Sequence, residues 1–319
     1  MRAITIDDYG TRPRLQDIPK PQAREGEVLI RLRAAGINPM DWKARDGWYK
    51  GWLPAEFPAV LGFDGAGDVE QVGSGVTAFQ PGEAVFGQFM PRVLHWGTYA
   101  DYMVTSATGA VVLKPAVLDY VQAAALPMPA QTALACVDAL SLVPRSTILI
   151  VGATGGVGTY AVQLAAQRGA RVLATARPDA ADYVNSLGAT EALDYSQGEA
   201  ALVAAALALH PGGIDAVLDL ATTTPEHLAR ISRALVRPGG KLLSTIESAE
   251  APTLAAQGIS ASTFSLMPSA ELLERIARFV DAGQLKVAEV RTYPLEQAAE
   301  ALEQLEHGHV RGKVVLRVA

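Results

Sequence analysis

The chain has 319 residues, of which 50% are hydrophobic and 19% charged, so it is long enough for two globular domains with sizeable cores. Its formal net charge of -6, with no long basic run, argues against a nucleic-acid-binding surface. Cys136 is the only cysteine, which excludes an internal disulfide and indicates a reducing compartment.

No membrane span is expected. The first ten residues, MRAITIDDYG, contain no long apolar run and enter a strand-like segment directly. Residues 121–140 look the most apolar, but Pro127, Pro129, Gln131 and Asp138 interrupt them. We therefore expect a soluble cytoplasmic protein with neither a membrane nor a nucleic-acid partner.

The first 120 residues predict a β-rich, barrel-like domain, because glycine and proline divide them into short runs. Apolar and charged residues alternate in Val28–Ala34, which is typical of a half-buried strand. Further short strands are expected at residues 65–72, 83–88, 97–104 and 110–114.

The pattern changes at Tyr120. Alanine-rich helical stretches then alternate with apolar strands, expected at residues 148–151, 171–175, 192–194, 216–219 and 241–244. This alternation predicts a parallel, doubly wound sheet. A helix over Ser269–Ala282 closes it, with apolar residues along one face. Gly312–Val318 is again a strand and returns to the first domain.

The predicted fold class is therefore α/β, with a β-rich barrel domain followed by a doubly wound parallel-sheet domain. We place the first at residues 1–121, the second at 122–287 and the C-terminal return at 288–319.

The stretch Ile148–Arg177 carries the clearest functional signal. An apolar strand, a glycine-rich turn, an amphipathic helix and a second apolar strand follow one another within about thirty residues, as in a dinucleotide-binding βαβ unit. Glycines let the backbone approach a pyrophosphate, and the helix N-terminus offers free N–H groups to it. The turn supplies the expected contacts: Gly152, Ala153, Thr154, Gly155, Gly156, Val157 and Gly158.

The end of the second strand indicates which nicotinamide cofactor binds. NAD-binding units usually place Asp or Glu there, against the ribose 2′-hydroxyl. Here the strand ends in Arg177, whose guanidinium matches a 2′-phosphate in charge and geometry. We therefore expect NADPH, with Asp179 as the one nearby carboxylate that opposes this choice.

Further motifs give a family resemblance that covers essentially the whole chain. They are residues 36–47 (GINPMDWKARDG), 61–76 (LGFDGAGDVEQVGSGV), 97–104 (GTYADYMV) and 308–316 (GHVRGKVVL). With the nucleotide motif, in this order, they resemble the medium-chain dehydrogenase/reductase superfamily, and within it the zinc-free NADPH:quinone oxidoreductase family. The resemblance implies a GroES-like catalytic domain, a Rossmann cofactor domain and an active-site cleft between them.

The residues themselves argue against zinc. Catalytic zinc needs three protein ligands, and the superfamily's structural zinc uses four cysteines, of which this chain has one. Zinc-dependent relatives read GHE where this chain has Gly62-Phe63-Asp64, and phenylalanine cannot bind a metal. The histidines are scattered singly, at positions 95, 210, 227, 307 and 309. No metal is therefore expected.

Without a Lewis acid, the remaining chemistry is hydride addition to an electron-poor acceptor. A quinone is the first candidate, and an enoyl or alkenal double bond is the second. Both place negative charge on oxygen, where hydrogen-bond donors or water can meet it. A third possibility is a non-catalytic role, since some zinc-free relatives are lens structural proteins (crystallins) or bind RNA; the glycine turn and the acidic charge oppose it.

The resemblance places Asn38 near the nicotinamide and the substrate, where its amide can donate to an oxyanion; the alternative is an Asn-Pro turn that satisfies only local backbone. Asp41, in the same motif, is expected to brace the loop. Thr132 resembles a family threonine that touches the cofactor, with helix capping as the alternative.

Tyr49 lies two residues beyond Gly47, where related enoyl-thioester reductases carry a proton-donating tyrosine. Quinone reductases often have tyrosine there too. With Trp42 and Trp48, and with Trp52 nearby, it can instead form an aromatic wall for a flat substrate, which is the interpretation we favour.

Four more positions follow from the resemblance. Tyr195 flanks the 2′-phosphate or packs at a strand end, and Lys313 reaches the cofactor phosphates or is a surface lysine. Phe264 and Leu266 border the nicotinamide, where apolar packing would exclude water. Residues 259–267 are expected to pair across a two-fold axis and form a homodimer.

Overall fold

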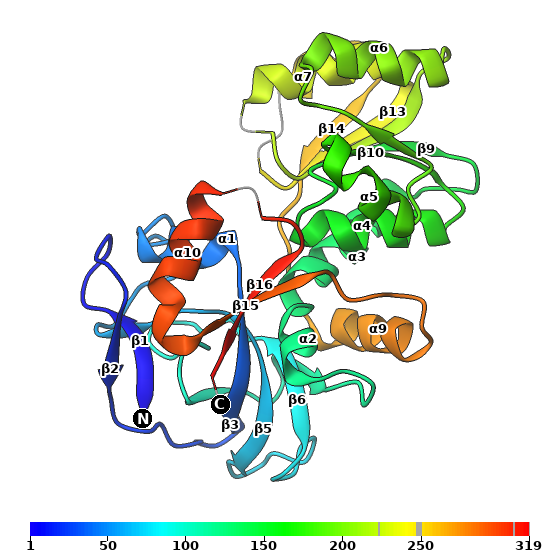
Figure 1. Ribbon diagram of the computed structural model, residues 1–319. Coiled ribbons are helices and arrows are strands. Elements are labelled where there is room, and N and C mark those ends of the chain that lie inside the picture. The colour runs from blue at the N-terminus through cyan, green and yellow to red at the C-terminus, as the bar shows by residue number, and fades with distance from the viewer. Residues whose placement is uncertain (223, 247–250, 309, 319) are drawn as a thin grey trace. The chain divides into compact units, whose positions relative to one another are not determined.

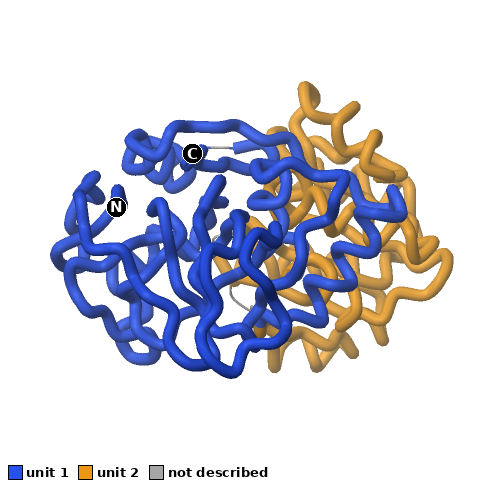
Figure 2. The backbone as a smooth tube through the Cα atoms, turned by 90° about the horizontal axis from the view of Figure 1, so that it is seen from below, with its two compact units in different colours: residues 1–131, 268–319 blue, residues 132–267 orange. Residues whose placement is uncertain are grey.

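The computed structural model describes residues 1–222, 224–246, 251–308 and 310–318 (Figure 1). The chain divides into two compact units, coloured separately in Figure 2. Residues 1–131 and 268–319 form one, which we call the terminal unit, and residues 132–267 form the other, which we call the central unit. None of the helices in the described ranges is long and apolar enough to cross a membrane.

The terminal unit is built mainly from antiparallel strands. A three-stranded sheet has the order β2-β1-β4, formed by β1 (Arg2–Ile6), β2 (Arg14–Asp17) and β4 (Ala59–Val60). A seven-stranded sheet has the order β15-β16-β3-β5-β6-β8, with β7 also paired to β3. Its strands are β3 (Glu27–Ile37), β5 (Asp64–Val72), β6 (Ala84–Gln88), β7 (Tyr102–Ser106), β8 (Ala110–Leu113), β15 (Val290–Pro294) and β16 (Lys313–Arg317).

Strand β3 organises this unit because it pairs with β5, β7 and β16. Val28, Leu29 and Ile30 are all buried, so this strand is covered on both faces rather than half-buried as its alternation suggested. It continues to Ile37 and leads directly into helix α1 (Pro39–Arg45). Helices α2 (Tyr120–Ala124), α9 (Ala270–Asp281) and α10 (Ala298–His307) complete the unit, with a short 3-10 turn at Leu295–Gln297.

The strand expected at residues 97–104 begins only at Tyr102. The residues before it are used differently: the N–H groups of Thr98 and Tyr99 donate to the carbonyls of Gly62 and Leu61. This connection buries the Tyr99 ring completely. It is therefore a loop that carries an inward-facing side chain.

The central unit is a six-stranded parallel sheet of order β11-β10-β9-β12-β13-β14. Its strands are β9 (Thr147–Val151), β10 (Arg171–Thr175), β11 (Glu191–Leu193), β12 (Ile214–Asp219), β13 (Val236–Ser244) and β14 (Ser260–Thr263). Its helices are α4 (Gly156–Gln167), α5 (Ala181–Ser186), α6 (Glu199–Leu209), α7 (Pro225–Leu235) and α8 (Ala251–Ala255), with a 3-10 turn at Pro178–Ala180; α3 (Pro127–Leu140) crosses the unit boundary. In Figure 1, α4 and α5 lie on one face of the sheet and α6 and α7 on the other.

This strand order confirms the doubly wound Rossmann arrangement. The chain proceeds from β9 outward to β11, then returns to the other side of β9 as β12. Such a reversal leaves a crevice at the carboxyl ends of the central strands, where ligands of these sheets bind. The glycine turn after β9 lies at this point.

The unit boundaries lie at residues 131 and 267, whereas the sequence suggested 121 and 287. Helix α9 forms as expected, but it packs against β8 of the terminal unit, and the Ser269 N–H donates to the Gln131 side chain at 3.0 Å. The C-terminal return is secured by Arg2, whose guanidinium donates to the Val318 carbonyl at 2.7 Å.

Candidate active site

Helix α1 places Asn38 at the end of β3. Asn38 is the N-cap residue and Pro39 follows at the first helical position, which suits a residue without an N–H. The Asp41 carboxylate reaches back and accepts from the Asn38 backbone N–H at 2.6 Å. This local geometry agrees with the bracing role expected of Asp41, and it leaves the Asn38 side chain free for other contacts.

The Asn38 amide is held by two charged groups, one of which donates a hydrogen bond to it and one of which accepts a hydrogen bond from it. Its Oδ1 accepts from the Lys313 ammonium at 2.6 Å, and its Nδ2 donates to the Asp64 carboxylate at 2.9 Å. An ammonium can only donate and an ionised carboxylate can only accept, so the two together fix which end of the amide is oxygen. One amide N–H has no partner among the described residues.

Lys313 is not a surface lysine. It begins β16, is only 4% exposed, and also donates to the Ile37 carbonyl at 2.6 Å. Its ammonium thus lies inside the terminal unit, bonded to the end of β3. Whether it also influences cofactor phosphates stays a prediction.

Two carboxylates share this buried cluster with one cation. Burial raises the pKa of Asp41 to about 7, and the charge of Asp64 adds to that effect. Burial likewise raises the pKa of Asp64 to about 6 and lowers the pKa of Lys313. One oxygen of each carboxylate has no partner in the described part of the chain, which is compatible with a proton held between pH 6 and 7.

Tyr99 is a member of this cluster that sequence reasoning missed. Its hydroxyl donates to Asp41 Oδ2 at 2.8 Å, and burial raises its pKa well above the usual range. Asp64 also accepts from the Met128 N–H at 3.0 Å. The only sequence signal was that Asp64 and Tyr99 stand in motifs quoted for the resemblance.

Aromatic side chains gather on the segment that follows Asn38. Trp42 and Trp48 meet edge to face with ring centroids 5.6 Å apart, and the ring centroids of Tyr49 and Trp52 are 4.9 Å apart. Trp48 is 64% exposed and Trp52 59% exposed, which is unusual for such large apolar groups. Burial raises the pKa of Tyr49, and the charge of Asp41 adds to it. These aromatic side chains thus form two contacting pairs on one segment, and their role as a wall for a flat substrate stays a prediction.

The glycine turn has the shape that a pyrophosphate needs. Gly152 has a φ of +82°, and a Cβ on Gly158 would lie 2.2 Å from the Gly152 carbonyl oxygen. By contrast, a Cβ on Gly155 would meet only that oxygen, at 3.5 Å, which is an ordinary van der Waals contact. Gly155 caps the twelve-residue helix α4 without a side chain. A phosphate group can therefore approach these N–H groups closely.

Arg177 and Tyr195 lie at the same edge of the sheet, because they follow the neighbouring strands β10 and β11. Both side chains are exposed. A hydrogen bond from Ser196 lowers the pKa of Asp194, and the charge of Arg177 contributes to this. Asp179, the opposing carboxylate, is exposed in the following turn.

The remaining predicted cofactor contacts lie in the central unit. Thr132 is 7% exposed on α3. Phe264 and Leu266 are half-buried just beyond β14, and the Phe264 N–H donates to the Ser244 carbonyl at 2.7 Å. Their contacts with a nicotinamide stay predictions.

The residues considered for metal binding are dispersed. Within the described ranges no group of three or more His, Cys, Asp or Glu side chains is placed to hold a metal ion. Phe63 is completely buried, and burial raises the pKa of the Cys136 thiol on α3 to about 12. His309 lies outside the described residues.

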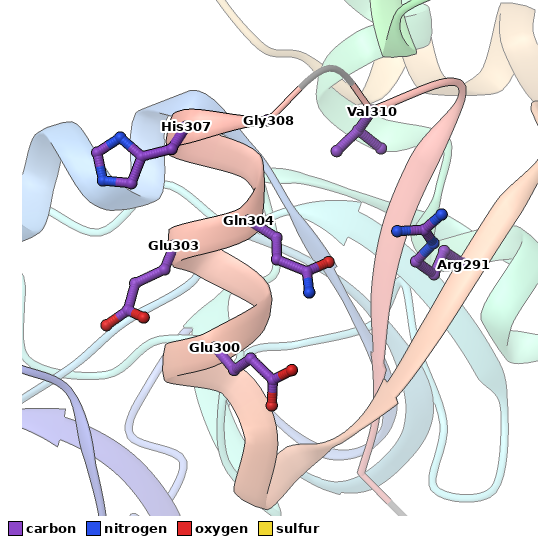
Figure 3. Close-up of a pocket in the computed structure, with 7 residues that line it drawn as sticks. All are labelled: Arg291, Glu300, Glu303, Gln304, His307, Gly308 and Val310. Carbon is purple, nitrogen blue, oxygen red and sulfur yellow. The ribbon is translucent and has the colours of Figure 1, made fainter.

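A groove of about 420 Å³ lies on another part of the terminal unit (Figure 3). Glu300 and Gln304 project from α10 toward Arg291 on β15, whereas Glu303 and His307 point away from it. None of its seven lining residues was predicted from the sequence to take part in a site, so we do not assign the function there.

Comparison with known proteins identifies both halves of the chain. Residues 24–116 match the family described as "Alcohol dehydrogenase GroES-like domain", and residues 187–316 match "Zinc-binding dehydrogenase". A chloroplast envelope quinone oxidoreductase homolog of Arabidopsis thaliana is 33% identical over 99% of this chain and 98% of its own length. An NADPH-dependent alkenal/one oxidoreductase of the same plant is 28% identical over 99% of this chain and 79% of its own length.

Among solved structures, the quinone oxidoreductase from Coxiella burnetii superposes with a TM-score of 0.87. It is 30% identical, and the match covers 100% of this chain and 99% of that one. Likeness over the full length of both chains means that the whole architecture, and not one domain alone, is shared.

The charged cluster predicts how stability depends on pH. The pKa of Asp41 is about 7 in the folded chain and 3.8 ordinarily, so between these values the folded chain binds the extra proton. The stability that this bound proton contributes is therefore lost as pH rises through this range. Asp41→Asn removes that dependence. Urea unfolding at pH 5 and pH 7 should show the variant gaining on the natural chain by up to about 1.4 kcal/mol per pH unit. The exposed Glu25→Gln is the control, and parallel profiles for Asp41→Asn and the natural chain would contradict the assignment.

The glycine turn predicts two separable effects. Gly158→Ala forces a Cβ against backbone, so it should lower the free energy of unfolding by about 1–3 kcal/mol. Gly155→Ala meets no such obstacle at φ -79° and should change stability by less than about 0.5 kcal/mol. It should nevertheless weaken NADPH binding about tenfold or more, because its Cβ occupies the pyrophosphate's approach. Thermal unfolding and NADPH fluorescence titration measure the two effects; unchanged NADPH affinity in Gly155→Ala would reject this cradle.

Proposed function

Because the chain belongs to the zinc-free quinone oxidoreductase family of medium-chain dehydrogenases/reductases, we propose that it is an NADPH-dependent reductase of quinones. The observation that carries this proposal is the Asn38 amide, fixed between Lys313 and Asp64 beside an aromatic wall. A flat acceptor on the wall would find a donor whose orientation is set in advance. Such preorganised donors stabilise charge that develops on oxygen.

The cofactor that fits the central unit is NADPH, which when bound supplies a hydride to the acceptor. The backbone of Gly152–Gly158 and the N-terminus of α4 would hold its pyrophosphate. Arg177 would pair with the 2′-phosphate, with Tyr195 beside it. Thr132, Phe264 and Leu266 are our proposed neighbours of the nicotinamide.

In the terminal unit, Asn38 would use its remaining N–H to donate to the acceptor oxygen. Lys313 and Asp64 do not need to touch the substrate for this, because they prevent the amide from turning over. Trp42, Trp48 and Tyr49 would bind the flat face of the acceptor. The acceptor oxygen could take its final proton from water, so quinone reduction needs no dedicated acid.

The second candidate is reduction of an activated double bond. It is favoured by the similarity to the alkenal/one oxidoreductase and by Tyr49 near the cluster. A non-catalytic role is opposed by the intact glycine turn. Turnover of 9,10-phenanthrenequinone against an enone, each with NADPH, separates the two enzymatic functions, and absence of both turnovers despite NADPH binding would favour the third.

We also propose that the chain forms a homodimer and works in the cytoplasm. Strand β14 is the edge strand of the central sheet, so a second copy of the chain can extend the sheet by pairing with it. The single buried cysteine supports a reducing compartment. The substrate is a small molecule, and the net charge of -6 opposes a nucleic-acid partner.

Cofactor choice yields a matched pair of variants. Arg177→Ala removes the proposed contact with the 2′-phosphate, so NADPH should bind about tenfold or more weakly while NADH is nearly unchanged. Arg171→Ala is the control, because Arg171 is also exposed but begins β10 at the opposite edge of the sheet. Dissociation constants for both cofactors test this. Equal losses for NADPH and NADH, or a native preference for NADH, would reject the role of Arg177.

Tyr49 distinguishes the two reductase functions. Burial and Asp41 raise its pKa, which makes its hydroxyl a weaker acid, so we expect Tyr49→Phe to be mild for both quinone and enone. Tyr49→Ala should mainly raise KM, because part of the wall is lost. Steady-state kinetics with both acceptors measure this. A loss of about 100-fold or more in kcat, confined to the enone and already present in Tyr49→Phe, would promote the double-bond reductase.

A further inference from the structure

Lys43 occupies an unusual place in the aromatic wall. Its Nζ lies 5.5 Å from the ring centroid of Trp42 and 5.3 Å from that of Trp48. The two indoles meet edge to face, so the ammonium faces both rings of the pair. Both distances are within the range of cation–π attraction, which also draws the lysine stem onto the rings.

This ammonium has no anionic partner in the described part of the chain. The neighbouring Arg45 is different, because its guanidinium pairs with Asp46 at 2.7 Å and with Glu306 at 3.0 Å. Lys43 is half-buried, and burial lowers its pKa with no carboxylate to offset the effect. A partly desolvated cation without a counter-charge is unfavourable, and it becomes favourable when a ligand supplies negative charge.

Its position relative to the proposed site is set by α1. Asn38 is the N-cap residue of α1, and Trp42 and Lys43 both lie within this seven-residue helix. Lys43 extends over the ring of Trp42. A flat molecule that stacks on this wall therefore has the ammonium within reach of its rim.

We propose that Lys43 donates a hydrogen bond to an oxygen of the acceptor and thereby selects conjugated carbonyl compounds that become anionic on reduction. This inference rests on the proposed function. The acceptor gains hydride, that is, one hydrogen nucleus and two electrons, from the reduced cofactor, and its oxygen becomes an anion. Lys43 stabilises that anion, and one proton from water completes the reduced product. No further oxidant or reductant is required.

A simple structural role for Lys43 makes a different prediction, and Lys50 provides the comparison. Lys50 lies in the same segment, with its Nζ 4.2 Å from the Tyr9 ring centroid, but it is exposed. If cation–π contact were the whole purpose of Lys43, the two lysines would behave alike on substitution. A substrate-binding role concerns Lys43 alone.

The first test needs neither cofactor nor turnover. 2-Naphthoate, a flat anion, is titrated into the chain while tryptophan fluorescence is followed, with the uncharged 2-naphthamide as a matched probe. Lys43→Met should weaken 2-naphthoate about tenfold or more and leave 2-naphthamide unchanged, Lys43→Arg should restore part of the affinity, and Lys50→Met should match the natural chain. Equal weakening of both probes by Lys43→Met would show that Lys43 only supports packing and would overturn the proposal.

The second test uses the full enzyme with NADPH and 9,10-phenanthrenequinone. Lys43→Met should lower kcat/KM for the quinone about 10- to 100-fold with the KM for NADPH unchanged, and Lys50→Met should have no effect. Unchanged kcat/KM in Lys43→Met would overturn the catalytic contact. If the natural chain reduced neither quinone nor enone while Lys43→Met still lost 2-naphthoate selectively, the proposed function would fail and the anion-binding role of Lys43 would stand.

Discussion

The arrangement of the terminal unit depends on one buried contact, between the Lys313 ammonium and the Asn38 amide. Lys313 and Asn38 are 275 positions apart, and the bond ties the start of β16 to the junction of β3 and α1. Asp64, at the start of β5, holds the other end of the same amide. Three strands and a helix thus meet at one side chain. Removing any one partner would leave a buried polar group unsatisfied, which costs far more than an exposed contact contributes.

This cluster is not a simple source of stability. A buried ion pair often stabilises a fold no better than apolar residues of the same volume, because both charges lose their hydration. Here two carboxylates lie near one ammonium, and burial raises the pKa of both despite the opposing effect of Lys313. What the cluster provides is orientation, because the Lys313 ammonium can only donate to the Asn38 amide oxygen and the Asp64 carboxylate accepts from the amide nitrogen. This is the property a reaction needs from a group that must meet a developing oxyanion.

Much of the fold was predictable from local pattern, and the cluster was not. The apolar run, the glycine turn and the helix after β9 follow one another in the chain, so the βαβ unit was evident, and the sheet order confirmed it. Lys313 shows the limit. Lys313 and Arg317 lie on the same side of β16 by strand alternation, yet one is buried and the other exposed. Lys313 differs in that its ammonium donates to the Ile37 carbonyl and to the Asn38 amide, at the end of β3. Tyr99 and the packing of α9 on β8 depend equally on distant segments.

The lysines of the terminal unit then divide by how their charge is met. Lys313 has its hydrogen bonds inside the fold, to a backbone carbonyl and an amide, and it thereby orients the Asn38 side chain. Lys43 lies only five positions from Asn38 along the chain, yet within the described ranges its ammonium contacts aromatic faces and no carboxylate, and these faces attract a cation without neutralising it. The two lysines therefore have different roles: the buried Lys313 positions Asn38, and the half-buried Lys43 is the one we propose to contact the substrate. In this unit the satisfied charge fixes the geometry of the site, and the unsatisfied charge is the one available to a substrate.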